Sequence, residues 1–164
     1  MGDYGARHLS PLLPRRPIRR DRQGGYHLNL SDDDRGVLRQ LAPQFRDLLD
    51  DPGQPVLQRL FPPAYSDAAH AEQQDEYRRL MQEDLVTRHR DELDLLGSTA
   101  AATHLSEEQL LGWTRALNSL RLVLGTFLDV SEDEERRPET VEESLYHWLS
   151  YLLGEAIEEL SGTT

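Results

Sequence analysis

The chain has 164 residues, with 18 Lys and Arg against 30 Asp and Glu, which gives a formal net charge of -12. Its length fits one domain of ordinary size. Cysteine is absent, which excludes disulfides, thiolate metal sites and thiol redox chemistry by this chain. No run approaches the roughly 18 consecutive apolar residues of a membrane span, and the N-terminus lacks the apolar stretch of a secretory signal. We therefore expect a soluble, cytoplasmic protein without a membrane partner.

The charge is unevenly distributed along the chain. Residues 1–27 contain six Arg and two Asp, a net charge of +4, which leaves -16 on the remaining residues. Residues 1–14 carry two Pro and two Gly with little periodicity, and a flexible tail is predicted there. Residues 15–162 are predicted to form a single domain, because no linker or internal repeat divides them.

A short β-hairpin is predicted over residues 15–30. Two short runs flank a Gly-Gly pair, and Tyr26, Leu28 and Leu30 alternate with polar residues, which is typical of a strand with one buried face. The rest of the domain, residues 31–162, is predicted to be a bundle of four to five helices. The expected fold class is therefore mainly α.

The first two helices are predicted from their start and stop signals. Ser31, followed by three Asp, caps a helix that Pro43 is expected to kink or split. Asp67 caps a long polar helix that runs to about Gly97 with a narrow apolar stripe. Met81 lies in that stripe, and we expect it to face the core.

The last two helices carry most of the apolar residues. Residues 106–109 form a capping box that opens a central core helix, which we expect to be contacted on two sides, with Gly125 permitting close approach of a neighbour. An acidic loop is predicted over 129–140. The last helix, about 139–160, has two apolar stripes, which indicates burial inside the bundle or against another chain. A homodimer through the last or the central helix is therefore expected.

Sequence motifs give little support for an enzyme. The chain lacks the phosphate-binding loop, the nucleophile elbow, the paired-histidine zinc motif and the dinucleotide fingerprint. Glu143 and His147 stand four apart on one helix face, where a solvated pair is favoured over a metal site. The acidic loop lacks the spacing of calcium ligands, and the other histidines lie without partners in register. We therefore expect no catalytic residues, no metal and no cofactor.

Five arginines in and beside the predicted hairpin are candidates for contact with nucleic acid. They could bind phosphates. However, the rest of the chain has a charge of -16 and repels a nucleic-acid backbone, and no predicted helix carries a basic face. Direct DNA binding is therefore the weaker hypothesis, and the favoured alternative is a hairpin whose arginines pair with the acidic body. The candidates are Arg15, Arg16, Arg19, Arg20 and Arg22.

Four apolar and aromatic segments are the most specific part of the sequence. They are Arg59-Leu-Phe-Pro-Pro-Ala-Tyr65, Glu76-Tyr-Arg-Arg-Leu80, the stretch from Trp113 to Gly125, and the stretch from Tyr146 to Leu152. Together, in order and over roughly residues 16–160, they resemble an actinobacterial family of domains of unknown function whose genes lie beside the ClpS adaptor. Some members of that family are named oxidative-stress-responsive transcriptional regulators.

The resemblance implies a non-enzymatic regulator of transcription that acts through protein partners such as an RNA polymerase sigma factor. In the family that this chain resembles, the redox-sensing members look as though they use a cysteine pair near the N-terminus. This chain has no cysteine, so we do not expect it to have a thiol switch of its own. Arg, Trp and Tyr are the residue types that most often anchor interfaces. The candidate partner-binding residues are Arg59, Phe61, Pro62, Pro63, Tyr65, Trp113, Arg115, Asn118, Arg121 and Trp148.

Two alternatives stay open at this point. Arg115, Asn118 and Arg121 lie three apart on the central helix, and pairing with carboxylates such as Glu76 or Asp84 inside the bundle is favoured over a partner-facing role. The runner-up function is a metal-binding, carboxylate-rich helical-bundle enzyme, which is supported only by the number of acids.

Overall fold

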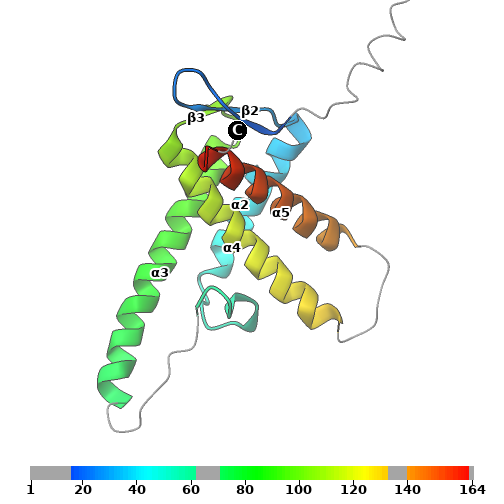
Figure 1. Cartoon of the computed structure of the whole chain (residues 1–164). Coiled ribbons are helices and arrows are strands. Elements are labelled where there is room, and N and C mark those ends of the chain that lie inside the picture. The colour runs from blue at the N-terminus through cyan, green and yellow to red at the C-terminus, as the bar shows by residue number, and fades with distance from the viewer. Residues whose placement is uncertain (1–15, 62–70, 133–139, 163–164) are drawn as a thin grey trace, which may run out of the picture.

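The computed structural model describes residues 16–61, 71–132 and 140–162 of the chain (Figure 1). The predicted fold class is confirmed, because this part is mainly helical with a small N-terminal antiparallel sheet. In the described ranges, no helix is long and apolar enough to cross a membrane. The elements in chain order are β1 (Ile18–Arg20), β2 (Tyr26–Leu28), α2 (Asp32–Leu48), the 3-10 turn η1 (Pro55–Leu57), α3 (Ala71–Thr99), β3 (His104–Leu105), α4 (Glu107–Glu132) and α5 (Val141–Leu160).

The sheet lies across one end of the helices (Figure 1). The predicted hairpin forms with Ile18 opposite Leu28, and Gly24 takes the positive φ of 95° that its turn requires. β3 adds a third antiparallel strand beside β2, with Tyr26 opposite Leu105. The sequence did not predict this strand, because two residues are too few to show a strand pattern.

Helix α2 begins as predicted, because the Ser31 side chain accepts a hydrogen bond of 3.1 Å from the backbone N–H of Asp34. The helix is not split at Pro43 but continues through it to Leu48. Pro43 lies on an exposed face, where the carbonyl that loses its helical partner can bond to water.

The Arg35 side chain fastens α2 to the sheet. Its guanidinium donates to the carbonyl oxygens of Leu28, Leu30, Ala100 and Ala102 at distances of 2.5 to 3.1 Å. These four carbonyls come from the end of β2 and from the connection between α3 and β3. One half-buried cation therefore satisfies backbone groups of two distant segments at once.

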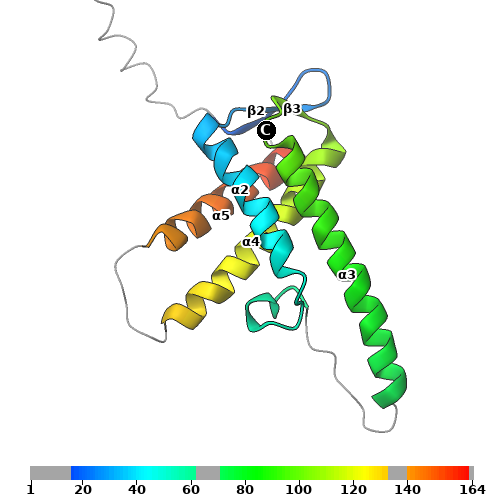
Figure 2. The ribbon, with the colours of Figure 1, turned by 180° about the vertical axis from the view of Figure 1, so that it is seen from behind.

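Helix α4 is the centre of the core, as predicted. The capping box forms in both directions: Gln109 N–H donates to Ser106 Oγ at 3.1 Å and Ser106 N–H donates to Gln109 Oε1 at 2.9 Å. Leu110 and Leu120 are fully buried, and α3 and α5 pack on two sides of the helix. Phe127, however, is 47% exposed, since α4 diverges from its neighbours at this end (Figure 2). The helix also runs to Glu132, so the first part of the predicted acidic loop is helical.

Helix α3 projects beyond the rest of the molecule at its N-terminal end (Figures 1 and 2). Leu93 and Leu96, in its C-terminal half, are buried, whereas Tyr77, Leu80 and Met81 are exposed. The prediction that Met81 faces the core is therefore wrong, because no helix of the described ranges covers this part of the stripe.

Helix α5 buries most of its two apolar stripes against α4. Leu149, Leu152, Leu153 and Ala156 are buried. The stripes are open to solvent at Val141, which is 81% exposed, and at Ile157, and Tyr151, outside the two stripes, is exposed as well.

The segment 52–61, which we call the wedge, contains η1 and lies in the fork between α3 and α4 (Figures 1 and 2). Leu57 and Leu60 anchor it, with 1% and 9% of their surface exposed. Gln54 fixes its turn by donating from Nε2 to the carbonyls of Leu48 and Asp51. The wedge thereby presents different side chains to the core, to α4 and α5, and to α3.

Candidate protein-binding groove

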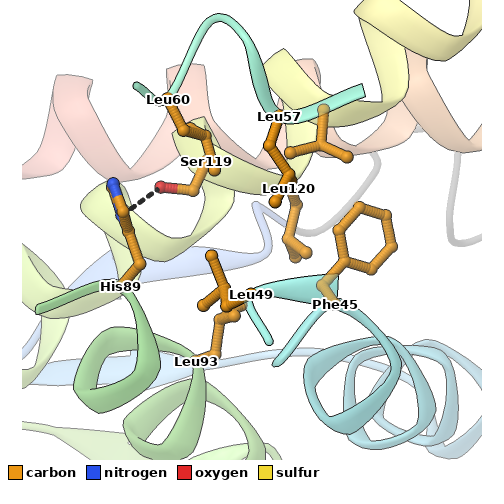
Figure 3. A pocket seen from close by; sticks show the side chains of 9 residues that line it. Phe45, Leu49, Leu57, Leu60, His89, Leu93, Ser119 and Leu120 are labelled. Carbon is orange, nitrogen blue, oxygen red and sulfur yellow. Dashed lines mark hydrogen bonds between the residues drawn. The ribbon is translucent and has the colours of Figure 1, made fainter. Parts of the chain in front are cut away.

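The buried side of the wedge closes a small cavity in the core (Figure 3). Its volume is about 10 Å³, which is room for at most one water molecule. Its lining is formed by Phe45, Leu49, Leu57, Leu60, His89, Leu93, Ser119, Leu120 and Val123. This cavity is therefore a packing feature and not a binding pocket.

His89 and Ser119 are the polar residues among those that line this cavity, and they contact each other through the His89 imidazole. The Nδ1 atom of His89 lies 3.3 Å from Ser119 Oγ and 3.4 Å from Glu92 Oε2, while its Nε2 is buried without a partner among the described residues. The ring of Phe61 meets the imidazole edge to face, with ring centres 5.7 Å apart. In a Ser-His-acid relay the hydroxyl and the carboxylate bond to different ring nitrogens. Here both share Nδ1, so the cluster does not have the geometry of a nucleophilic triad.

On its second side the wedge meets α4 and α5 through Arg59. Arg59 forms an ion pair with Asp129, and its guanidinium lies beside Gly125. A Cβ on Gly125 would lie 3.2 Å from both Arg59 Nη1 and Tyr146 Cε2, so the predicted close approach at Gly125 is confirmed. Glu143 completes this cleft of about 370 Å³ together with His147 and Leu128. Among the described residues, no three or more His, Asp or Glu side chains are grouped to hold a metal ion.

On its third side the wedge and α3 enclose an open groove of about 810 Å³. Phe61 comes from the end of the wedge, and Tyr77, Met81 and Leu85 come from successive turns of α3. Tyr77 is 65% exposed and Met81 is 45% exposed. Pro52, Gly53, Gln54, Pro55, Gln58, Arg78 and Gln82 complete the lining. Amide groups therefore surround an apolar floor, as in the core and rim of many protein interfaces.

The surroundings of the groove are acidic. Glu72, Asp75 and Glu76 lie on the exposed first turns of α3, and Asp51 precedes the wedge. Arg78 is the one cation among the described residues that line the groove, and Asp75 lies 3.7 Å from its Nη1. An occupant with apolar side chains and flanking positive charges is complementary to this surface.

The candidate partner-binding residues are not gathered at one place. Phe61 lines the groove and Arg59 lies on the opposite side of the wedge. Trp113 is fully buried, with its indole N–H donating to Thr99 Oγ1 at 2.7 Å, so it belongs to the core and not to a surface. Trp148 is half-buried on α5. Pro62, Pro63 and Tyr65 lie outside the described residues.

In the part of the chain that the structure describes, the polar residues of α4 do not form the ion pairs with α3 that the sequence favours. Arg121 donates to Asn118 Oδ1 at 3.2 Å within the helix, and Arg115 is exposed. Asp84 pairs with Arg88 on α3 at 2.8 Å instead of reaching α4. The expected pairing between these helices is therefore replaced by contacts within each helix.

The arginines of the hairpin divide into two groups. Arg16 and Arg20 face α5: Arg16 Nη1 lies 3.4 Å from Glu159 Oε1, and the Arg20 backbone N–H donates to Glu159 Oε2 at 3.1 Å. Arg20 also donates to the Tyr26 hydroxyl, and this hydrogen bond raises the pKa of Arg20. Arg19 and Arg22 are exposed, and Arg15 lies outside the described residues.

The fold is a small helical bundle capped by a three-stranded sheet, and its groove has the composition of a protein-binding surface. The family model for a domain of unknown function, DUF2017, matches residues 15–160. The chain therefore belongs to the DUF2017 family. No curated protein and no solved structure matches it.

Tyr77, Met81 and Leu85 are the site residues that the sequence did not assign. Their helical spacing instead predicts that they form the core-facing stripe of a long polar helix. One signal did distinguish them: the stripe is thin and interrupted in the N-terminal half of the helix, where charged residues dominate.

Proposed function

We propose that this DUF2017 protein is a non-enzymatic regulator that acts by binding another protein in the groove between the wedge and α3. The observation that carries the proposal is the exposed stripe of Tyr77, Leu80 and Met81 on a projecting helix, beside Phe61. Contiguous apolar surface on a small acidic protein marks an interaction site, because exposing it to water costs free energy.

The partner class that we favour is an RNA polymerase sigma factor, which makes the protein a transcriptional regulator of the oxidative-stress-responsive type. The four-segment resemblance supports this choice, and Phe61 and Tyr77, which line the groove, belong to two of those segments. The acidic surroundings favour a partner segment that carries basic residues. Regulation by this chain would not use a thiol of its own, since it has no cysteine.

Direct binding to purified sigma factors and core RNA polymerase of the source cells tests the proposal. The groove variant is Tyr77→Ser with Met81→Ser, and the matched control is Val141→Ser, which removes an apolar side chain that is 81% exposed on α5. We expect one sigma factor to bind, and its affinity to fall by about tenfold or more in the groove variant only, as for an interface hot spot.

Capture from lysate, with and without nuclease, separates protein from nucleic-acid partners. A sigma factor or polymerase subunit that is retained after nuclease and lost with the groove variant supports the proposal. Recovery of nucleic acid alone, or equal binding by the groove and control variants, contradicts it.

A further inference from the structure

Two histidines that are 77 positions apart in the sequence meet on the solvent-facing side of the sheet. β2 and β3 pair with His27 directly opposite His104. His27 Nδ1 lies 3.2 Å from His104 Nε2, and the ring centres are 4.8 Å apart. His104 is exposed and His27 is half-exposed, so both are accessible to an ion from solution. The expectation that these histidines have no partners is therefore wrong.

The separation of the two nitrogens matches the bite of a metal chelate. Zinc binds histidine nitrogen at about 2.0–2.1 Å and prefers tetrahedral geometry. Two such bonds to atoms 3.2 Å apart enclose an angle of about 100°, close to the tetrahedral angle of about 109°. The same two nitrogens lie within hydrogen-bond distance of each other, so a bound ion would replace a hydrogen bond whose donor depends on the tautomers of the two rings.

Neighbouring groups support the same geometry. Thr103 Oγ1 lies 3.0 Å from His104 Nδ1 and can accept its proton, which leaves the Nε2 lone pair for an ion. The Thr103 backbone is held in place because its carbonyl accepts the N–H of Leu28 at 2.8 Å. Asp21 Oδ2 lies 3.8 Å from His104 Nε2 and adds a negative charge beside the pair.

One charge opposes the site. Arg19 stands opposite His27 on β1, so a cation lies in the same cross-strand row as the two imidazoles. Because no group of three or more ligands is assembled in the described residues, water must complete the coordination. These two facts make the expected affinity lower than that of a closed structural zinc site.

We propose that His27 and His104 form a two-histidine chelate for a divalent transition-metal ion, with zinc as the expected ion and Asp21 as an outer carboxylate. Imidazole nitrogen selects such ions over calcium and magnesium. The bound ion links β2 to β3 and so connects the hairpin to the start of α4. Zinc would thereby stabilise the end of the bundle at which Arg35 and Glu159 hold the sheet.

The test uses the full chain without a histidine tag, titrated with Co²⁺ as a spectroscopic substitute for zinc and with Zn²⁺ by calorimetry. We expect one ion per chain, a tetrahedral-type Co²⁺ spectrum that Zn²⁺ abolishes, and a rise of the melting temperature with Zn²⁺. His27→Ala and His104→Gln should each lower the affinity by about tenfold or more. Arg19→Ala should raise it and Asp21→Asn should lower it.

The matched control is His147→Ala, which removes a surface histidine from α5 beside Glu143. It should leave Zn²⁺ affinity unchanged. The proposal is overturned if His147→Ala abolishes binding while His104→Gln does not, or if the wild-type chain shows no saturable binding. Circular dichroism establishes that each variant is folded, and His104→Gln is the safer substitution because His104 is exposed and β3 pairs through its backbone.

Discussion

The indole N–H of Trp113 on α4 donates a hydrogen bond of 2.7 Å to Thr99 Oγ1 at the end of α3. Thr99 in turn donates to the carbonyl of Leu95 at 2.6 Å, so its hydroxyl both accepts and donates a hydrogen bond. A fully buried tryptophan needs such an acceptor, because an unpaired N–H in the core is costly. The contact explains why Trp113 acts in folding and not in partner binding.

We predict that Thr99→Val lowers the free energy of unfolding by about 1–3 kcal/mol, because it leaves the Trp113 N–H unsatisfied without changing the size of the side chain. Urea denaturation measures the change. Thr87→Val is the matched control, since Thr87 is exposed on the same helix and its hydroxyl donates to the carbonyl of Glu83 in that helix. An equal loss in both variants would show that the buried hydrogen bond contributes nothing.

Replacing Arg35 by Lys should destabilise the protein by about 2 kcal/mol, because one ammonium cannot serve the four carbonyl oxygens that the planar guanidinium contacts. Arg39→Lys, on the exposed face of α2, should change stability by less than about 0.5 kcal/mol. Thermal unfolding of the two variants side by side provides the comparison. A similar melting temperature for both would contradict the role of Arg35.

His89→Leu is expected to change the free energy of unfolding by less than about 1.5 kcal/mol, although the side chain is only 15% exposed. The reason is that leucine removes the unpartnered Nε2 atom together with the bonds made at Nδ1. Chemical denaturation checks this. If the free energy of unfolding fell by more than about 3 kcal/mol, the contacts of Nδ1 with Ser119 and Glu92 would stabilise the protein by more than the unpaired Nε2 destabilises it.

Removing the Glu159 carboxylate should loosen β1, because this side chain accepts the Arg20 backbone N–H and pairs with Arg16. In Glu159→Ala we expect faster amide exchange at Arg20, measured by NMR, with little change in global stability, since the Arg16 pair is exposed. Asp91→Ala, on the outer face of α3, is the control and should leave exchange at Arg20 unaltered.

The homodimer remains a prediction, and the exposed part of α5 is where it can be tested. Ile157 is 53% exposed and Tyr151 is 51% exposed, while most of both apolar stripes is covered by α4. We expect the wild-type chain to sediment as a dimer at micromolar concentration and Ile157→Glu to sediment as a monomer, since a buried unpaired charge opposes association. A wild-type monomer of 18.8 kDa would refute the prediction.

What the sequence determined by itself is local. Ser31 and the Ser106–Gln109 capping box specified helix starts, and the Gly-Gly turn specified the hairpin, because each depends on hydrogen bonds or backbone angles within a few residues. The apolar spacing of α4 also identified the centre of the core, since it fits a helix covered on two sides.

Only the tertiary structure decided which apolar residues are covered. The stripe of α3 is buried at Leu96 and exposed at Met81, because α2 and α4 pack beside one part of the helix and leave the other projecting. Likewise, β3 brings His104 to His27, and the fold turns Arg35 toward carbonyls of distant segments. Such contacts join residues far apart in the chain, and periodicity within one segment carries no information about what lies opposite it.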